Sequence, residues 1–194
     1  MDIILASTSP YRRALLERLQ LRFSCSPPEV DEVPRPDEAP QALAERLALA
    51  KAIAVADLHP DALVIGSDQV ASIGGGIIGK PGNFENARAQ LRLSSNNEVM
   101  FYTGLALVSR ARRFERLHVE PFAVRFRALD DTRISNYLLR EEPYDCAGSF
   151  KAEGLGVALF EQLTGNDPTS LEGLPLIALS TLLAEAGVDV LGEH

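Results

Sequence analysis

An apolar stretch interrupted by three polar residues constrains this chain more than any other feature of its sequence. Residues Ala62–Gly66 read as a buried strand, and Val70–Ile73 continue the apolar pattern after Ser67-Asp68-Gln69. Burying polar side chains in a strand costs free energy unless they have hydrogen-bond partners or serve a ligand. The triplet therefore indicates a site where a carboxylate lies at the break of a buried strand.

The composition fits a single folded domain and excludes several classes of protein. Of the 194 residues, 46% are apolar and 24% are charged, which excludes disorder as the dominant state. The 19 basic and 27 acidic side chains give a net charge of −8, whereas binding a polymeric nucleic acid requires a basic stripe. No apolar run reaches the roughly 18 residues of a membrane span, and the first residues lack a signal-peptide pattern. We therefore expect a cytoplasmic protein with neither a membrane nor a nucleic-acid polymer as partner.

The apolar periodicity predicts strands and helices that alternate irregularly. Strands are expected over Ile3–Ala6, Ala62–Ile73, Ile77–Gly82, Val99–Ser109, His118–Arg127 and Cys146–Lys151. Helices are expected from Pro10 after an N-cap at Ser9, along a face of Leu43, Leu47, Ala50 and Ala54 that Lys51 borders, and over Asn83–Leu93, Asp130–Arg140 and Leu174–Ala186. The pattern indicates a mixed α/β protein and not a strict βαβ series.

The stretch Gly74–Lys80 looks like the start of a phosphate-binding loop, but the rest of that motif is missing. The next residue is Pro81, which supplies neither the hydroxyl that binds Mg²⁺ nor the backbone N–H that cradles a phosphate. The three glycines Gly74–Gly76 instead indicate a hairpin turn. Lys80 can still reach a phosphate group as a point charge.

The histidines and cysteines indicate neither a metal site nor a nucleophile. His59, His118 and His194 lack metal-ligand spacing and an evident serine or cysteine partner, so we expect them at the surface. Cys25 and Cys146 have no second cysteine or histidine at metal-binding spacing, so no zinc site or disulfide is predicted and both are expected in the core.

Charged residues at the ends and breaks of predicted elements fit phosphate chemistry. Four cations and two acids belong to this set: Arg12, Arg13, Lys51, Lys80, Glu32 and Asp68. Both arginines fall in the first turn of a helix, where the dipole already presents positive charge and a bound anion would be favourable. Carboxylates hold a hard divalent cation, and Asp68 also suits the role of accepting a proton from an attacking water. From spacing alone, the same residues are also compatible with ordinary solvated surface charges.

Seven short motifs follow one another along the whole chain and are specific when taken together. They are Ser7-Thr8-Ser9-Pro10-Tyr11-Arg12-Arg13, Val30-Asp31-Glu32, Lys51-Ala52, Gly66-Ser67-Asp68-Gln69-Val70, Gly79-Lys80-Pro81, Phe101-Tyr102-Thr103-Gly104 and Ala147-Gly148-Ser149-Phe150-Lys151-Ala152-Glu153-Gly154. In these motifs the chain resembles the Maf family of nucleotide pyrophosphatases.

The resemblance implies a fold and a reaction. The fold would be similar to that of inosine triphosphate pyrophosphatases: α/β, with an elongated, twisted mixed sheet, flanking helices and a cleft between two lobes. Residues 1–194 would form a single Maf-like domain whose lobes share one core. The reaction would be metal-dependent hydrolysis of a nucleoside triphosphate to the monophosphate and pyrophosphate, with Mg²⁺ or Mn²⁺ as cofactor. The family is also compatible with a homodimer.

The resemblance also implies roles for individual residues. By motif position, Asp68 would be the catalytic carboxylate and Glu32 its companion at the metal site. The residues that would grip the phosphates are Ser7, Arg12, Arg13, Lys51 and Lys80.

Three motif positions differ between branches of the family, and here they are Tyr11, Gln69 and Glu153. The branch that acts on dTTP and UTP typically has arginine, threonine and glutamine at these positions, so this chain resembles the branch that hydrolyses 7-methyl-GTP. A physical argument agrees: the positively charged ring of 7-methylguanine is attracted by the face of Tyr11. Glu153 can accept hydrogen bonds from the ring N–H and amino group of guanine.

Two other functions stay open from the sequence. One is a non-catalytic nucleotide-binding regulator of septum formation, which would bind nucleotide without multiple turnovers. The other is a housecleaning pyrophosphatase for other modified or canonical nucleotides. A panel of nucleotides assayed for pyrophosphate release would separate all three.

Overall fold

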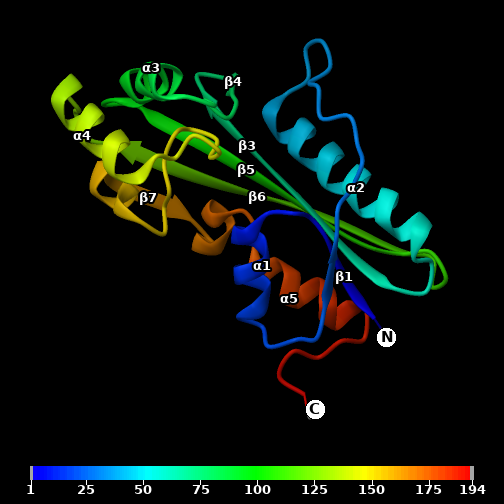
Figure 1. The fold of residues 1–194 in the computed structure, drawn as a ribbon. Coiled ribbons are helices and arrows are strands. Elements are labelled where there is room, and N and C mark those ends of the chain that lie inside the picture. The colour runs from blue at the N-terminus through cyan, green and yellow to red at the C-terminus, as the bar shows by residue number, and fades with distance from the viewer. Residues whose placement is uncertain (1, 193–194) are drawn as a thin grey trace.

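The computed structural model describes residues 2–192 as a long sheet with helices on both faces (Figure 1). Its helices are α1 (Pro10–Glu17), α2 (Pro40–Leu58), α3 (Phe84–Ser94), α4 (Asp131–Glu141) and α5 (Leu176–Glu185), with 3₁₀ helices η1 (Leu155–Leu159) and η2 (Pro168–Glu172). Its strands are β1 (Ile3–Ala6), β2 (Ser24–Ser26), β3 (Leu63–Ile73), β4 (Gly76–Ile78), β5 (Glu98–Ser109), β6 (Phe114–Phe126) and β7 (Phe160–Gly165).

The described strands form one mixed sheet in the order β2-β1-β3-β5-β6-β7, with β4 paired to β3. Strand β1 runs parallel to β2 and β3, and the other pairs are antiparallel. In Figure 1, α2 lies along the sheet, while α1 with α5 and α3 with α4 lie toward opposite ends. The predicted elongated mixed α/β fold is confirmed.

The polar centre of β3 is divided between the two faces of the sheet, because alternate residues of a strand point to opposite sides. Leu63 and Ile65 pack in one apolar cluster with α5, and Ser67 and Gln69 point to that same face. Asp68 points to the other face, which α2 covers. The triplet therefore serves both faces of the sheet.

Two glycines allow α2 to pack very close to the sheet beside Asp68. Gly66 precedes Asp68 by two residues on the same face, and Gly104 of β5 is the register partner of Asp68. A Cβ on Gly66 would lie 2.2 Å from the backbone oxygen of Ala48, and one on Gly104 would lie 2.2 Å from that of Ala44. The backbone of α2 therefore packs directly against the backbone of the sheet at these two glycines. This close packing brings Lys51 of α2 within reach of Asp68.

Several local predictions are confirmed. Ser9 caps α1 by accepting a hydrogen bond from the Arg12 amide. The predicted hairpin joins β3 to β4, where Gly74 and Gly75 adopt φ angles of 56° and 85°. Capping and turn chemistry act over a few residues, so the sequence is sufficient to predict them.

Other predictions are wrong. The segment 146–151 is not a strand, because Gly148 and Ser149 adopt φ angles of 79° and 62°, which extended chains do not accommodate. Ala50 and Ala54 lie beside the buried face of α2, which follows the 43, 44, 47, 48, 51 pattern. Neither cysteine lies in the core: Cys25 is exposed, because β2 is the edge strand of the sheet, and Cys146 is half-buried. The strand expected over Ile77–Gly82 ends at Ile78. No expectation covered β2, β7 or the two 3₁₀ helices.

We expect Gly66→Ala to destabilise the protein by about 1–3 kcal/mol, since the added methyl must displace the backbone of α2. Gly79→Ala is the matched control, because a Cβ there meets nothing within 4 Å. Chemical denaturation measures both. Equal stability of the two variants would contradict the close packing of helix and sheet.

Candidate active site

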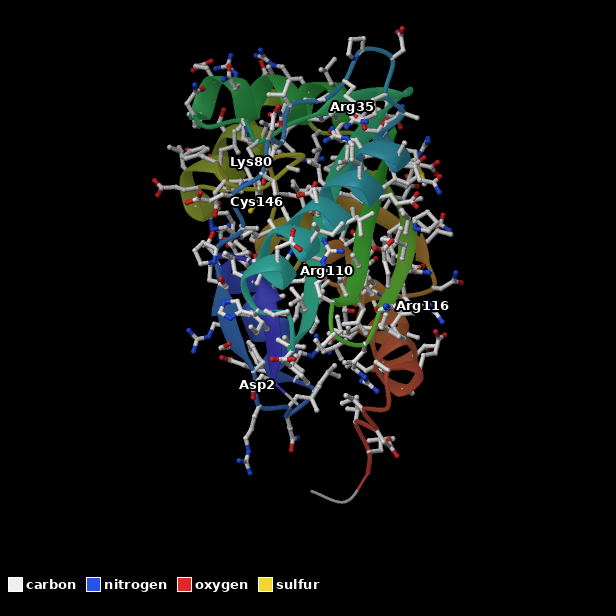
Figure 2. The ribbon with its side chains drawn as sticks, turned by 90° about the vertical axis from the view of Figure 1, so that its right-hand side faces the viewer. Asp2, Arg35, Lys80, Arg110, Arg116 and Cys146 are labelled. Carbon is white, nitrogen blue, oxygen red and sulfur yellow. The ribbon has the colours of Figure 1, made fainter. Side chains whose placement is uncertain are left out.

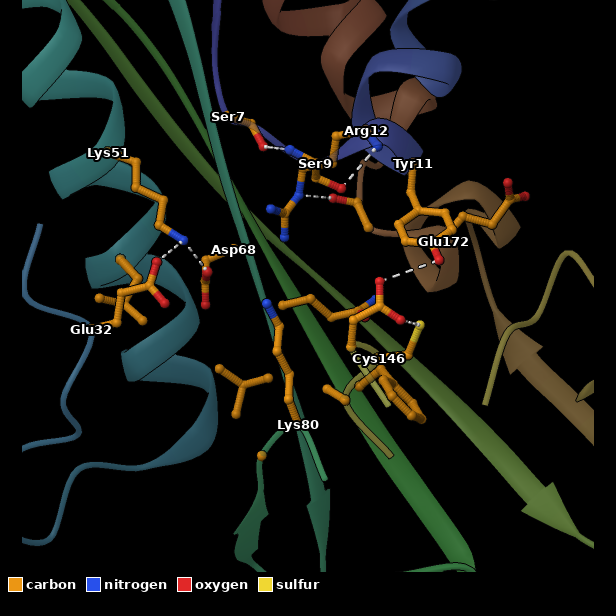
Figure 3. Close-up of a pocket in the computed structure, with 18 of the residues that line it drawn as sticks. Ser7, Ser9, Tyr11, Arg12, Glu32, Lys51, Asp68, Lys80, Cys146 and Glu172 are labelled. Atoms are coloured by element: carbon orange, nitrogen blue, oxygen red, sulfur yellow. Dashed lines mark hydrogen bonds and ion pairs between the residues drawn. The ribbon is translucent and has the colours of Figure 1, made fainter. Parts of the chain in front are cut away.

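The centre of the site is a buried lysine that contacts two carboxylates. The Nζ atom of Lys51 lies 2.6 Å from Oδ1 of Asp68 and 2.6 Å from Oε1 of Glu32 (Figure 3). Lys51 is only 6% exposed and Asp68 9%. A buried ammonium is tolerated when it is paired and hydrogen-bonded, and the hydrogen bond from Lys51 is also the main reason why the pKa of Glu32 lies below its ordinary value.

Glu32 reaches Lys51 from an irregular segment, residues 27–39, which we call the strap. The strap runs beside α2, with Arg35 near its turn (Figure 1 and Figure 2). Arg46 of α2 holds it, donating from Nε to Oε1 of Glu38 at 2.6 Å and from Nη2 to Oε2 at 2.8 Å. The same guanidinium donates to the backbone oxygen of Val33 at 3.1 Å, next to Glu32. The hydrogen bonds from Arg46 lower the pKa of Glu38 to about 2, so the Glu38 carboxylate stays ionised at neutral pH.

The buried lysine lies on the wall of a cavity of about 650 Å³. On one side, Ser7, Arg12 and Lys80 also line the cavity, and Figure 3 shows Lys80 and Arg12 directed toward Asp68. The positive charges of Lys80 and Arg12 lower the pKa of Glu32 further. We call this side the cationic end.

Two hydrogen bonds fix Arg12 at the cationic end, one from its amide and one from its side chain. Its amide donates to Ser9 Oγ at 3.4 Å, and its Nε donates to the backbone oxygen of Gly173 at 2.8 Å. Burial lowers the pKa of Arg12, while the charges of Asp68 and Glu32 favour its protonated form. The guanidinium therefore has a defined position from which it can receive an anion.

Arg13 does not join the other predicted phosphate-binding residues. Its Nε lies 3.1 Å from Oε1 of Glu17, both side chains are exposed, and it is not among the described residues that line the cavity. Consecutive residues of a helix point in different directions, about 100° apart. Since α1 turns Arg12 inward, it turns Arg13 outward.

The other side of the cavity is aromatic and acidic. Tyr11 lines it and donates from its hydroxyl to Oδ2 of Asp145 at 3.4 Å. Glu153 and Glu172 line it as well, and burial raises the pKa of Glu172. Cys146 is half-buried here, and burial followed by the charge of Asp145 raises its pKa to about 12, so its thiol is a poor nucleophile at neutral pH. We call this side the acidic end.

Ser67 and Gln69 hold η2 against the cavity from the opposite face of the sheet. Ser67 Oγ donates toward the backbone oxygens of Gly104 and Gly173, at 2.8 and 3.0 Å. Gln69 Nε2 donates to the backbone oxygens of Ser170 and Leu171, at 2.8 and 3.1 Å. Gln69 therefore anchors η2 in addition to lining the cavity.

Glu172 and Gly173 line the cavity although no sequence pattern singled them out. A signal for η2 does exist in the sequence: Asp167 followed by Pro168 is an N-cap followed by the residue preferred at the first helical position. That signal predicts the start of a helix, but only the fold brings its end to Ser67 and Arg12.

The described part of the chain, residues 2–192, contains no cluster of three or more histidine, cysteine or acidic side chains arranged to hold a metal. His59 is exposed as predicted, and His118 is half-buried with Nε2 2.9 Å from Glu120 Oε2; His194 lies outside the described residues. None of the helices over the described range is both long and apolar enough to span a bilayer.

Glu32 and Asp68 nevertheless suit a divalent cation that arrives with a phosphate. Both carboxylates approach a single positive charge, the Lys51 ammonium, at 2.6 Å. Mg²⁺ typically binds through one or two carboxylates while substrate phosphates and water complete its coordination. The donor set of the site is therefore compatible with such an ion bound together with a polyphosphate.

Comparison with known proteins gives consistent results. The family model for Maf-like proteins matches residues 2–186. A relative from Colwellia psychrerythraea, named 7-methyl-GTP pyrophosphatase, is 52% identical over 99% of this chain and 96% of its own length. A relative of the same name from Pseudomonas fluorescens is 54% identical over 98% of this chain and 99% of its own length. A third, from Nitrosococcus oceani, is 53% identical over 97% and 95%.

The fold also resembles a solved structure, that of the Staphylococcus aureus Ham1 protein. The TM-score is 0.57 at 12% identity, and the match covers 96% of this chain and all of the other. At this identity the likeness concerns the fold alone. It agrees with the fold class expected from the motifs.

We expect Arg46→Ala to release the strap without unfolding the protein, because Arg46 fixes both Glu38 and the Val33 carbonyl. Cleavage after Glu32 by a glutamate-specific protease, followed by mass spectrometry, should then become several-fold faster.

Arg92→Ala is the matched control for this experiment. It removes a pair of the same two-bond geometry, from Arg92 to Asp131 at 2.6 and 2.7 Å, between α3 and α4. If the strap is cleaved at the same rate in both variants, Arg46 is not its anchor.

Proposed function

The chain belongs to the Maf family, and on that premise we propose that it is a nucleotide pyrophosphatase that hydrolyses 7-methyl-GTP to 7-methyl-GMP and pyrophosphate. The names of the three relatives support the substrate. The observation that carries the proposal is the placement of Asp68, fixed by Lys51 on a cavity wall that Arg12 and Lys80 also line.

The cationic end suits the phosphates of such a substrate. Arg12, Lys51 and Lys80 present positive charge to one region of the cavity, and the charge that develops on a departing pyrophosphate is stabilised by such fixed cations. Ser7 lies beside them as a hydroxyl donor, with its Oγ also accepting from the Ser9 amide at 3.1 Å.

Asp68 is the group we propose to activate water. Lys51 contacts its Oδ1, and the second carboxylate oxygen can accept the proton of a water molecule. The oxygen of that water forms a bond to the α-phosphorus, the bond from the α-phosphorus to the bridging oxygen breaks, and pyrophosphate leaves. The contact with Lys51 at 2.6 Å keeps the carboxylate oriented for this role.

We also propose a divalent cation, Mg²⁺ or Mn²⁺, as cofactor. Glu32 and Asp68 would hold it together with phosphate oxygens. When bound, it supplies positive charge that neutralises the phosphate oxygens. Holding the two carboxylates close together, before substrate arrives, is the task of Lys51 and of the strap.

The acidic end suits a positively charged base. Tyr11 offers an aromatic face, its hydroxyl contacts the carboxylate of Asp145, and Glu153 and Glu172 also line the cavity. The ring of 7-methylguanine is positively charged and carries hydrogen-bond donors, so both features favour it. A neutral pyrimidine would gain little from either.

We expect Asp68→Asn to lower kcat by about 10²–10⁴-fold while the fold is kept. The fold should survive because Glu32 still pairs with the Lys51 ammonium and the amide fills the same volume. Pyrophosphate release and thermal unfolding measure the two effects. Asp57→Asn is the control, since it changes an aspartate of α2 that pairs with Arg110 at 2.7 Å outside the cavity. Turnover at the wild-type rate in Asp68→Asn would refute the assigned role.

We expect Glu153→Gln to reduce the preference for 7-methyl-GTP over UTP by about tenfold to a hundredfold, the equivalent of one charge-assisted hydrogen bond. The ratio of kcat/KM for the two nucleotides measures it. Glu161→Gln, on the exposed strand β7, is the control. An unchanged ratio in Glu153→Gln would exclude this contact as the source of specificity.

The same panel decides between the proposal and its alternatives. A protein that binds nucleotide without repeated turnover would be a regulator, and faster turnover of another modified or canonical nucleotide would indicate a different substrate.

A further inference from the structure

The loop that carries Lys80 into the cavity is held on both sides of that residue by one helix. The backbone oxygen of Gly79 accepts from Gln90 Nε2 at 3.0 Å, and that of Pro81 accepts from Asn86 Nδ2 at 2.9 Å. Gln90 and Asn86 lie on α3, one turn apart. Two carbonyls fixed on either side of a residue restrict its backbone, so the direction in which Lys80 points is set by α3.

Gln90 makes a second contact, to the opposite side of the cavity. Its Oε1 accepts from Ser149 Oγ at 2.5 Å. The orientation of the amide is unambiguous, because the carbonyl of Gly79 can only accept and must therefore face the NH₂ group. One amide thus joins the Lys80 loop to the segment 145–153, which we call the acidic loop because it carries Asp145 and Glu153.

The acidic loop has a strained backbone that needs such support. Ser149 is fully buried and adopts a φ of 62°, a left-handed conformation that costs free energy for a residue with a side chain. Its neighbour Phe150 anchors the loop in the core, with its ring centroid 4.9 Å from that of Phe160 and 5.3 Å from that of Phe101. Gln90 supplies the polar contact that the Ser149 hydroxyl requires in this buried position.

We propose that Gln90 is a positioning residue that couples the two ends of the cavity. It fixes Lys80 at the cationic end and, through Ser149, the loop of Glu153 at the acidic end. Phosphate binding and base recognition then both depend on the side chain of Gln90, which does not itself line the cavity. This inference rests on the proposed function for its kinetic consequences but not for its structural ones.

Three variants loosen the two loops separately or together. Asn86→Ala loosens only the Lys80 loop, and Ser149→Ala loosens only the acidic loop. Gln90→Ala loosens both and should fold, because Gln90 is half-buried and alanine favours a helix. The double variant Asn86→Ala/Ser149→Ala should reproduce the pattern of Gln90→Ala.

Amide hydrogen exchange of the full chain tests the coupling without reference to activity. We expect exchange to become about twofold to tenfold faster in both loops of Gln90→Ala, in the Lys80 loop alone for Asn86→Ala, and in the acidic loop alone for Ser149→Ala, as loss of single hydrogen bonds predicts. Faster exchange in only one loop of Gln90→Ala, or in neither, would overturn the proposal.

Two functional measurements follow the same logic. Inhibition by inorganic triphosphate reports on the cationic end alone, and the ratio of kcat/KM for 7-methyl-GTP and UTP reports on the acidic end. Gln90→Ala should weaken triphosphate binding and lower the ratio, each by about twofold to tenfold, whereas Asn86→Ala should change only the first and Ser149→Ala only the second. A wild-type protein that releases no pyrophosphate from any nucleotide would remove the proposed function, while hydrogen exchange would still decide the coupling.

Discussion

The buried Lys51 ammonium is the interaction on which the rest of this site depends. A cation this deep in the protein is stable only if carboxylates accompany it, and removing one partner of such a pair typically costs about 3–5 kcal/mol. Asp68 comes from the sheet and Glu32 from the strap, so the single charge of Lys51 joins two segments that are distant along the chain. The glycines at 66 and 104 are part of the same requirement, because side chains there would hold α2 away from the sheet and Lys51 away from Asp68.

The polar triplet in β3 organises both walls of the cavity from a single stretch of three residues. Asp68 faces α2 and the strap, while Ser67 and Gln69 hold η2 on the opposite face. Since the carbonyl of Gly173, just after η2, accepts from both Ser67 and Arg12, the position of the guanidinium also depends on the triplet. The cost of interrupting an apolar strand is thereby offset by hydrogen bonds on both sides.

The sequence predicted those parts of the structure that depend on short-range chemistry. The Ser9 cap, the hairpin glycines and the polar break at Asp68 follow from a few neighbouring residues, and the motifs gave the family. It failed where tertiary contacts decide. Whether Arg12 or Arg13 faces the cavity depends on which side of α1 packs on the sheet, and the path of 146–151 depends on left-handed residues held by Gln90. No pattern in the sequence indicates that Gln90 contacts two loops so distant along the chain.

The opposite charges at the two ends of the cavity give specificity a simple physical basis. Every nucleoside triphosphate presents negative charge to Arg12, Lys51 and Lys80, so the cationic end contributes affinity but little discrimination. The carboxylates near Tyr11 act differently, because they attract a cationic base. A neutral base would displace water from these carboxylates without compensating for the loss of their hydration, so it binds less well. Discrimination therefore requires the two ends to be held at the distance that separates a base from its phosphates. A rigid link between the Lys80 loop and the acidic loop supplies that constraint, and the two hydrogen bonds of the Gln90 amide are placed to provide it.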